Sequence, residues 1–379
     1  MNIKSTQVNQ VIEVKKQSNQ EKRIIKIFGD FKEISGRNVN GISEGRYLYI
    51  ETIPNGQETY IPFQKFQELV SEAKTLSSTK VFTEESQVKS SVDVLKQETI
   101  RSPDFKELLN YLVTKINLSL KNGEDEIVVT SEEAIFLELP WEDIVEEKIS
   151  VIREVIPQAN NDFEERENNL LLLVSHAEEL NGNNLTSLRE KLDDEISDIY
   201  SLVGSIKKNE IPKSYKLQTI LLSIHTTKEL LKSLQWEKYN YVHLIMHGIN
   251  TGELCFETVQ NHKVVDSMTI EELLGTLKSY HFQLLFFSFC FSGGGVNSSE
   301  SLAFQIVRRG ISKYVVGYSS PVGENSASLF AKYFYDILLN GTTNERGGFQ
   351  LEAVYKEALK KYYSEKSNTK YVPYLYVNK

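Results

Sequence analysis

Residues 170–174, LLLLV, form a continuous apolar run, which is the pattern of a β-strand covered on both faces. Similar apolar runs follow, with helical periodicity between them: TILLSI (219–224), YVHLIM (241–246), QLLFFSF (283–289) and KYVVGY (313–318). Strands that alternate with helices require crossover connections between parallel neighbours. The sequence therefore predicts an α/β fold with a mainly parallel sheet and helices on both of its faces.

Shorter signals mark the helices and the end of this region. Thr269 and Glu272 have the spacing of a capping box, which predicts the start of a helix over IEELLGTL (270–277). A last strand is predicted at VPYLYV (372–377). Before the long apolar runs, EIVVT (126–130) and AIFLEL (134–139) are predicted as strands, and Leu139-Pro140-Trp141-Glu142 is predicted to open a helix.

The N-terminal third has a different pattern. Three short strand-like runs occur there: RIIKIF (23–28), RYLYIET (46–52) and TYIPF (59–63). Asn55-Gly56 between the last two is typical of a hairpin turn. We predict a small β-rich module over residues 1–73, which precedes the larger domain and is regulatory in role. Residues 74–103 are rich in Ser, Thr, Lys, Glu and Gln and are predicted as a linker. Residues 104–379 form the larger domain.

Composition excludes several classes of protein. With 379 residues, 40% of them hydrophobic and 25% charged, the chain has the composition of an ordinary globular protein. A net charge of −9 argues against a general nucleic-acid binder. No apolar run approaches the ~20 residues of a membrane span, and the polar start has no secretory apolar core. Two cysteines, Cys255 and Cys290, fit a reducing compartment, so we expect a cytoplasmic protein.

Two predicted strands end in residues that suit a nucleophile and its base. YVHLIM is followed by His247-Gly248, and QLLFFSF is followed by Cys290 and soon by Gly293. A thiol attacks a carbonyl only as the thiolate, so it needs a base close by. In sheets of this class active residues lie beyond the carboxyl ends of the strands. Glycine beside each residue lets backbone N–H groups approach an oxyanion. The pattern indicates acyl-transfer chemistry.

Structural roles for these residues are the alternative. A lone buried cysteine is more often a small core side chain than a nucleophile, and a single histidine near a strand end is more often part of the packing. Cys255, within the alternating run ELCFE, is expected to be packed. Cys255 and His262 have no partners at zinc-ligand spacing, so neither a metal nor another cofactor is predicted.

Residues from about 125 to 379 resemble the CHAT domain, a caspase-like cysteine peptidase family in the clan of caspases and separases. The matching features are Leu139-Pro140-Trp141-Glu142, YVHLIMHG (241–248), the Cys290 strand with Ser292-Gly293, the stretch 313–341 and the C-terminal strand. The order also fits, because caspases place their histidine roughly 50 residues before the cysteine. The resemblance implies a caspase-like fold, with His247 as base, Cys290 as nucleophile, and Gly248 and Cys290 as oxyanion donors.

Three further residues are expected to bind substrate. His176 follows the first long apolar run, although a plain loop histidine is the simpler interpretation. Glu324 opens a predicted helix near the expected cleft, where it would select a basic residue, or only stabilise the helix dipole. Ser288, two positions before Cys290, occupies a position that shapes specificity pockets in related peptidases. The sequence departs from the family pattern at Phe289, where a small residue is usual, and Phe291 is bulky as well.

Two functions follow from this. The first is a regulated bacterial cysteine endopeptidase that cleaves a partner protein in anti-phage defence, controlled by an activating protein or a small signalling ligand. The second is a catalytically silent interaction or sensor scaffold, in which Phe289 and Phe291 block the cleft. Neither function involves nucleic acid or a membrane.

Overall fold

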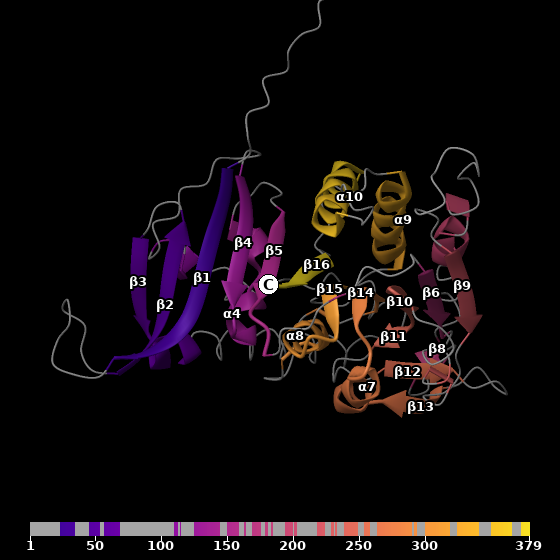
Figure 1. The fold of residues 1–379 in the computed structure, drawn as a ribbon, viewed down its shortest axis with the longest axis horizontal. Coiled ribbons are helices and arrows are strands. Elements are labelled where there is room, and N and C mark those ends of the chain that lie inside the picture. The colour runs from indigo at the N-terminus through magenta and orange to yellow at the C-terminus, as the bar shows by residue number, and fades with distance from the viewer. Residues whose placement is uncertain are drawn as a thin grey trace, which may run out of the picture.

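The computed structural model describes residues 23–34, 45–53, 57–68, 110–112, 114, 125–144, 150–158, 163, 169–175, 179–180, 183–184, 194–199, 201–202, 218–223, 229–230, 232, 239–248, 254–257, 264–289, 292–293, 300–318, 324–340, 350–365 and 373–379. Their main feature is a sheet of eleven strands in the order β3-β2-β1-β4-β5-β16-β15-β14-β10-β6-β9 (Figure 1).

The C-terminal half of this sheet is the parallel sheet predicted from the apolar runs. Its parallel strands are β6 (Asn169–Val174), β9 (Gln218–Ser223), β10 (Tyr241–Ile245), β14 (Phe282–Ser288) and β15 (Ser312–Tyr318). The last strand, β16 (Pro373–Asn378), runs antiparallel to β15. Beyond it β5 (Val151–Val155) and β4 (Asp125–Ser131) lie parallel to β16.

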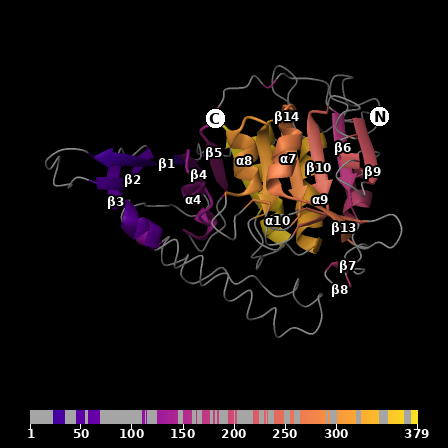
Figure 2. The same cartoon turned by 90° about the horizontal axis from the view of Figure 1, so that it is seen from below.

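Helices cover both faces of the sheet, which confirms the predicted fold class. α9 (Glu324–Asn340) and α10 (Leu351–Glu365) lie on one face, and α7 (Ile270–Leu277) and α8 (Leu302–Arg308) lie on the other (Figures 1 and 2). α10 shows why such helices form, since it buries one stripe of side chains at helical spacing: Leu351, Val354, Tyr355, Ala358, Leu359 and Tyr362. None of the described helices is both long and apolar enough to cross a bilayer.

Local signals for α7 and the N-terminal hairpin are also confirmed. The Thr269 side chain accepts a hydrogen bond from the Glu272 backbone N–H, and the Glu272 side chain accepts one from the Thr269 N–H. β2 (Gly45–Ile53) and β3 (Gln57–Pro62) pair antiparallel. Residues 54–56 of the predicted turn lie outside the described residues.

The N-terminal strands continue the large sheet. β1 (Arg23–Ile34) pairs with β2 on one side and lies parallel to β4 on the other. Buried side chains of β1 and β2, such as Ile27 and Leu48, belong to the same hydrophobic core as those of β14. The division of the chain at residues 73 and 103 stays a prediction, but the first three strands share a sheet and a core with residues 125–379.

One predicted strand is wrong. Residues 134–139 do not form a strand: α4 (Ala134–Leu137) is a single helical turn, and the turn η1 (Trp141–Ile144) follows it. A short apolar run cannot by itself distinguish a strand from a buried helix. Here the Phe136 ring packs directly on Gly29 of β1, at a point where a Cβ would have no room.

Small strands complete the described structure. β11 (His247–Gly248), β12 (Leu254–Glu257) and β13 (Val264–Met268) form a separate three-stranded antiparallel sheet. β7 (Glu179–Leu180) and β8 (Asn183–Asn184) pair with each other.

Candidate active site

The two strands that lead to His247 and Cys290 are neighbours in the sheet. β10 and β14 are parallel, and each β10 residue pairs with the residue 43 positions later, from Tyr241 with Leu284 to Ile245 with Ser288. Both strands therefore end at the same edge of the sheet, which is the edge where active residues lie in folds of this class.

The predicted site residues are described to different extents. His247 and Gly248 form β11, of which the structure describes the backbone, and His247 is the pairing partner of Cys255 in β12. Glu324 is the first residue of α9, again described by its backbone. Cys290 and His176 lie outside the described residues.

Ser288, the last residue of β14, is 4% exposed. Its hydroxyl donates a hydrogen bond to Glu195 Oε1 at 2.7 Å and lies 2.8 Å from His243 Nε2. Its predicted part in substrate binding stays a prediction.

The segment after β14 is held firmly against the end of β15. The Ser292 hydroxyl donates to the Phe289 carbonyl at 2.9 Å and accepts from the Tyr318 N–H at 3.0 Å. The Gly293 N–H donates to the Tyr318 carbonyl at 2.9 Å. A Cβ on Gly293 would lie 2.8 Å from the carbonyl carbon of Gly317, so this close approach requires glycine. The backbone on both sides of residues 290–291 is thereby fixed to neighbouring strands.

More distant elements hold the same segment. The Tyr376 hydroxyl of β16 donates to the Gly293 carbonyl at 2.7 Å. The Ser292 carbonyl accepts from the Ala303 N–H of α8 at 2.9 Å. At the start of α8, the Ser301 N–H donates to Glu138 Oε1 at 2.6 Å. Strand β16, helix α8 and the residue that follows α4 thus all support the region after Cys290.

Phe289 packs into the core. It directly follows β14 and is 3% exposed, and its ring centroid lies 5.1 Å from that of Phe287 on β14. The bulky side chain at this position, where the family pattern has a small residue, is therefore part of the hydrophobic core. Phe291, the second bulky neighbour of Cys290, lies outside the described residues.

Glu195, His243, Ser288 and Tyr335 form a buried polar cluster beneath the strand ends. Glu195 is 2% exposed, and Glu195 Oε1 lies 3.3 Å from His243 Nε2. The Tyr335 hydroxyl of α9 lies 3.2 Å from His243 Nδ1. The ring of His243 also lies between aromatic neighbours, at 4.4 Å from Phe286 and 5.6 Å from Tyr335.

Of these four residues, only Ser288 was predicted from the sequence. His243 stands four positions before His247, and alternation along a strand places residues of the same parity on one face, so the histidine could have been singled out. Nothing local indicates Glu195, which bonds to a residue 93 positions away, or Tyr335.

Tyrosines on this face of the sheet remain neutral. Burial, followed by the charge of Glu195, raises the pKa of Tyr335 and of Tyr318 well above the ordinary range. Among the described residues, the buried Tyr318 hydroxyl has no hydrogen-bond partner. No cluster of three or more histidine, cysteine or carboxylate side chains in the described residues is arranged to hold a metal ion.

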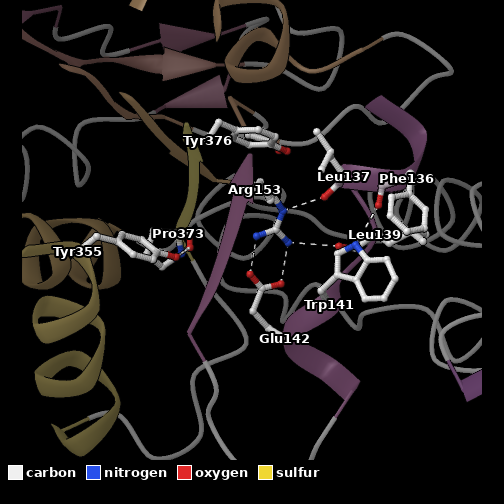
Figure 3. Close-up of polar contacts among 10 residues, drawn as sticks. Phe136, Leu137, Leu139, Trp141, Glu142, Arg153, Tyr355, Pro373 and Tyr376 are labelled. Atoms are coloured by element: carbon white, nitrogen blue, oxygen red, sulfur yellow. Dashed lines mark hydrogen bonds and ion pairs between the residues drawn. The ribbon is translucent and has the colours of Figure 1, made fainter. Parts of the chain in front are cut away.

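A second buried cluster explains the Leu139-Pro140-Trp141-Glu142 motif (Figure 3). Arg153 of β5 is fully buried and donates to both carboxylate oxygens of Glu142, at 2.6 and 2.8 Å. It also donates to the carbonyls of Leu137 and Leu139. Burial alone would lower the pKa of Arg153, but the Glu142 charge outweighs it and the pKa is raised. The Trp141 indole N–H donates to the Phe136 carbonyl at 2.9 Å.

Comparison with known proteins identifies a family. The CHAT domain family model matches residues 106–370, which is more than half of the chain. No curated protein matches the chain.

Three solved structures are similar to it at low identity. A secreted C11 cysteine protease from Bacteroides thetaiotaomicron, in complex with an irreversible peptide inhibitor, has 13% identity and a TM-score of 0.34 over 54% of this chain and 60% of that chain. The Saccharomyces cerevisiae separase–securin complex has 11% identity and a TM-score of 0.39 over 94% and 30%. The Drosophila initiator caspase Dronc has 12% identity and a TM-score of 0.30 over 56% and 81%. This chain thus spans less than two thirds of the first two.

Proposed function

This chain belongs to the CHAT domain family, and from that premise we propose that it is a cysteine endopeptidase in which His247 and Cys290 carry out nucleophilic catalysis. The observation that carries the proposal is the register of β10 on β14. Its offset of 43 positions equals the separation of residues 247 and 290 in the chain. The described pairing ends at Ile245 with Ser288, where neighbouring parallel strands lie ~4.8 Å apart, and His247 and Cys290 each follow two residues later. Such neighbouring starting points suit a thiol and the base that activates it.

The proposed reaction follows from these two groups. His247 accepts the proton of the Cys290 thiol, and the thiolate attacks the carbonyl carbon of the scissile peptide bond. The tetrahedral intermediate collapses to a thioester, and the departing amine takes the proton from His247. Water, deprotonated by His247, then hydrolyses the thioester and restores the thiol. The backbone N–H groups of Gly248 and Cys290 are proposed to stabilise the oxyanion.

Substrate binding is assigned to residues around the same edge of the sheet. We propose that Ser288, Glu324 and His176 contribute to the substrate cleft, with Glu324 selecting a basic residue. Ser288 is 4% exposed, so a substrate would meet it at the base of the cleft. The substrate is a partner protein.

Control of this activity is the remaining part of the proposal. An unregulated endopeptidase would damage its own cell, so we propose activation by a partner protein or a small signalling ligand, in a bacterial defence against phage. The segments 74–103 and 157–169 are the proposed points of ordering or cleavage. The scaffold alternative requires Phe289 and Phe291 to block the cleft. The place of Phe289 in the hydrophobic core supports the peptidase, and Phe291 lies outside the described residues.

Thiol reactivity tests the proposal. Brief iodoacetamide treatment near neutral pH, followed by mass spectrometry, should label Cys290 about tenfold faster than Cys255, because the thiolate is the reactive form. His247→Ala should remove that advantage. Cys255 is the other cysteine of the chain and serves as the internal control. Its backbone pairs with that of His247 across β11 and β12, so a general disturbance of β11 by the His247→Ala substitution would change the labelling of Cys255 as well. The measurement is repeated with candidate activators, because an inactive proenzyme would gain His247-dependent labelling when it is activated. Slow labelling of Cys290 that is indifferent to His247→Ala both with and without activators, or preferential labelling of Cys255, would overturn the proposal.

A further inference from the structure

Beneath the proposed catalytic pair lies the buried polar cluster of Glu195, His243, Ser288 and Tyr335. Glu195, His243 and Tyr335 have no part in the reaction or the substrate binding proposed above, and Ser288 receives a second role here besides its proposed contact with substrate. We propose that the cluster is a positioning device, which holds the ends of β10 and β14 at the separation that His247 and Cys290 require. This inference rests on the proposed function.

The cluster bridges the two strands that lead to the catalytic pair. The contact of 2.8 Å between His243 Nε2 and Ser288 Oγ joins β10 to β14 through side chains, in addition to their backbone pairing. His243 stands four positions before His247, and Ser288 stands two before Cys290. A shift of either strand along the other would therefore break this contact and misalign the ends together, so the contact opposes such a shift.

The hydrogen bonds form one directed chain. The Ser288 hydroxyl donates its only hydrogen to Glu195, so in the contact with His243 it accepts, and a neutral His243 must carry its proton on Nε2. Nδ1 then accepts from the Tyr335 hydroxyl, 3.2 Å away. The chain runs from Tyr335 through His243 and Ser288 to the carboxylate. For a neutral His243 these donors and acceptors fit in one way only, which specifies one arrangement of the elements that carry them.

Two further elements lock this arrangement. Glu195 belongs to the helical residues 194–199, and Tyr335 belongs to α9. An ion pair between Asp198 and Lys332, at 3.1 Å, connects the same two elements nearer the surface. A buried carboxylate is costly unless it is hydrogen-bonded, so Glu195 resists any movement that would separate it from Ser288.

The cluster is not a second nucleophilic triad. In such a triad the acid bonds to the histidine nitrogen that does not face the serine. Here Glu195 bonds to Ser288 itself and lies near the same nitrogen, Nε2. Since Ser288 and Glu195 are almost fully buried, these are positioning residues that act through His247 and Cys290.

The test combines alkylation of Cys290 with a matched control. Ser288→Ala and Tyr335→Phe each remove a hydroxyl from the series of hydrogen bonds in the cluster. Tyr355→Phe is the control, because it removes an equally buried tyrosine hydroxyl, which donates to the Pro373 carbonyl at 2.8 Å. All three variants should lower the melting temperature to a similar extent. Ser288→Ala and Tyr335→Phe should also slow iodoacetamide labelling of Cys290 by about five- to tenfold, the size of one hydrogen bond, and Tyr355→Phe should not.

The same substitutions in a His247→Ala background distinguish the positioning of His247 and Cys290 from a general loss of stability. There they should leave the labelling rate unchanged, because no catalytic pair remains to be misaligned. Equal slowing in both backgrounds, or labelling like that of Tyr355→Phe, would overturn the positioning role while the proposed function stands. A wild-type protein whose Cys290 labelling does not depend on His247 would overturn both.

Discussion

Arg153 shows how much a single residue can organise in this fold. Its guanidinium is fully buried, makes two bonds to Glu142, and lies 3.4 Å from the centre of the Tyr374 ring on β16. Tyr376 on the same strand in turn holds Gly293. A buried ion pair is not in itself evidence of stability, but here it determines where the turn η1 and the strand β16 meet.

Removal of one partner of this pair should therefore be costly. Glu142→Gln leaves the Arg153 charge buried without its counter-ion, and we expect a loss of about 3–5 kcal/mol in the free energy of unfolding. Glu300→Gln is the matched control, because Glu300 pairs with Arg308 at 2.8 Å on a partly exposed surface. That change should cost about 1 kcal/mol or less. Urea unfolding measures both, and equal effects would contradict this account.

At the scale of elements, the important contact is between the end of β14 and the end of β15. Phe289 packs into the core on one side of residues 290–291, and Ser292 and Gly293 bond to Tyr318 on the other. The segment that carries the proposed nucleophile is thus supported at both ends by regular structure, which is the condition for a precise site.

A side chain at Gly293 should disturb this contact. In Gly293→Ala the new Cβ would lie 2.8–3.0 Å from backbone atoms of Gly317 and Tyr318, which cannot move aside as a flexible side chain can. We expect a loss of about 1–3 kcal/mol in stability and slower labelling of Cys290.

Gly275 in α7 is the matched control for this change. A Cβ at Gly275 would meet no atom of another element within 4 Å, so Gly275→Ala should stabilise the helix by about 0.5–1 kcal/mol. Thermal unfolding and alkylation rates would show the contrast between the two variants, and wild-type behaviour of Gly293→Ala would refute it.

At the scale of the whole molecule, the large sheet joins the N-terminal strands to the region that matches the CHAT domain family. β1 lies parallel to β4 over seven pairs of residues, from Arg23 with Asp125 to Gly29 with Ser131. Since the core is continuous across this junction, we expect the two parts to unfold together.

A substitution that leaves a cavity beside β1 should therefore destabilise the whole molecule. Ile27→Ala, at a fully buried position, should lower the free energy of unfolding by about 2–5 kcal/mol. Ile24→Ala, 48% exposed on the same strand, should change it by about 0.5 kcal/mol or less. Both tryptophans, Trp141 and Trp236, lie outside residues 1–73, so their fluorescence reports the larger region. If Ile27→Ala left the tryptophan transition unchanged, residues 1–73 would be an independent module.

Features that depend on neighbours along the chain could be predicted from the amino-acid sequence. Apolar runs such as residues 170–174 became parallel strands, and the Thr269–Glu272 spacing became a capping box. The two strands that flank Asn55-Gly56 paired antiparallel, as this turn signal indicated. Each of these follows from side-chain periodicity or from hydrogen bonds over a few residues. The candidate pair His247 and Cys290 came from the ends of two such strands together with the family resemblance, and it stays a prediction.

Features that depend on distant partners became visible only in the folded molecule. Residues 134–137 form a helical turn where a strand was predicted, and β5 was not predicted. Arg153 forms a buried ion pair with Glu142 that no local pattern indicates. Glu195 reached Ser288 across 93 positions. The free energy of a buried charge or hydrogen bond is determined by the groups that surround it after folding. Those groups come from distant parts of the sequence, so the pattern of neighbouring residues does not identify them.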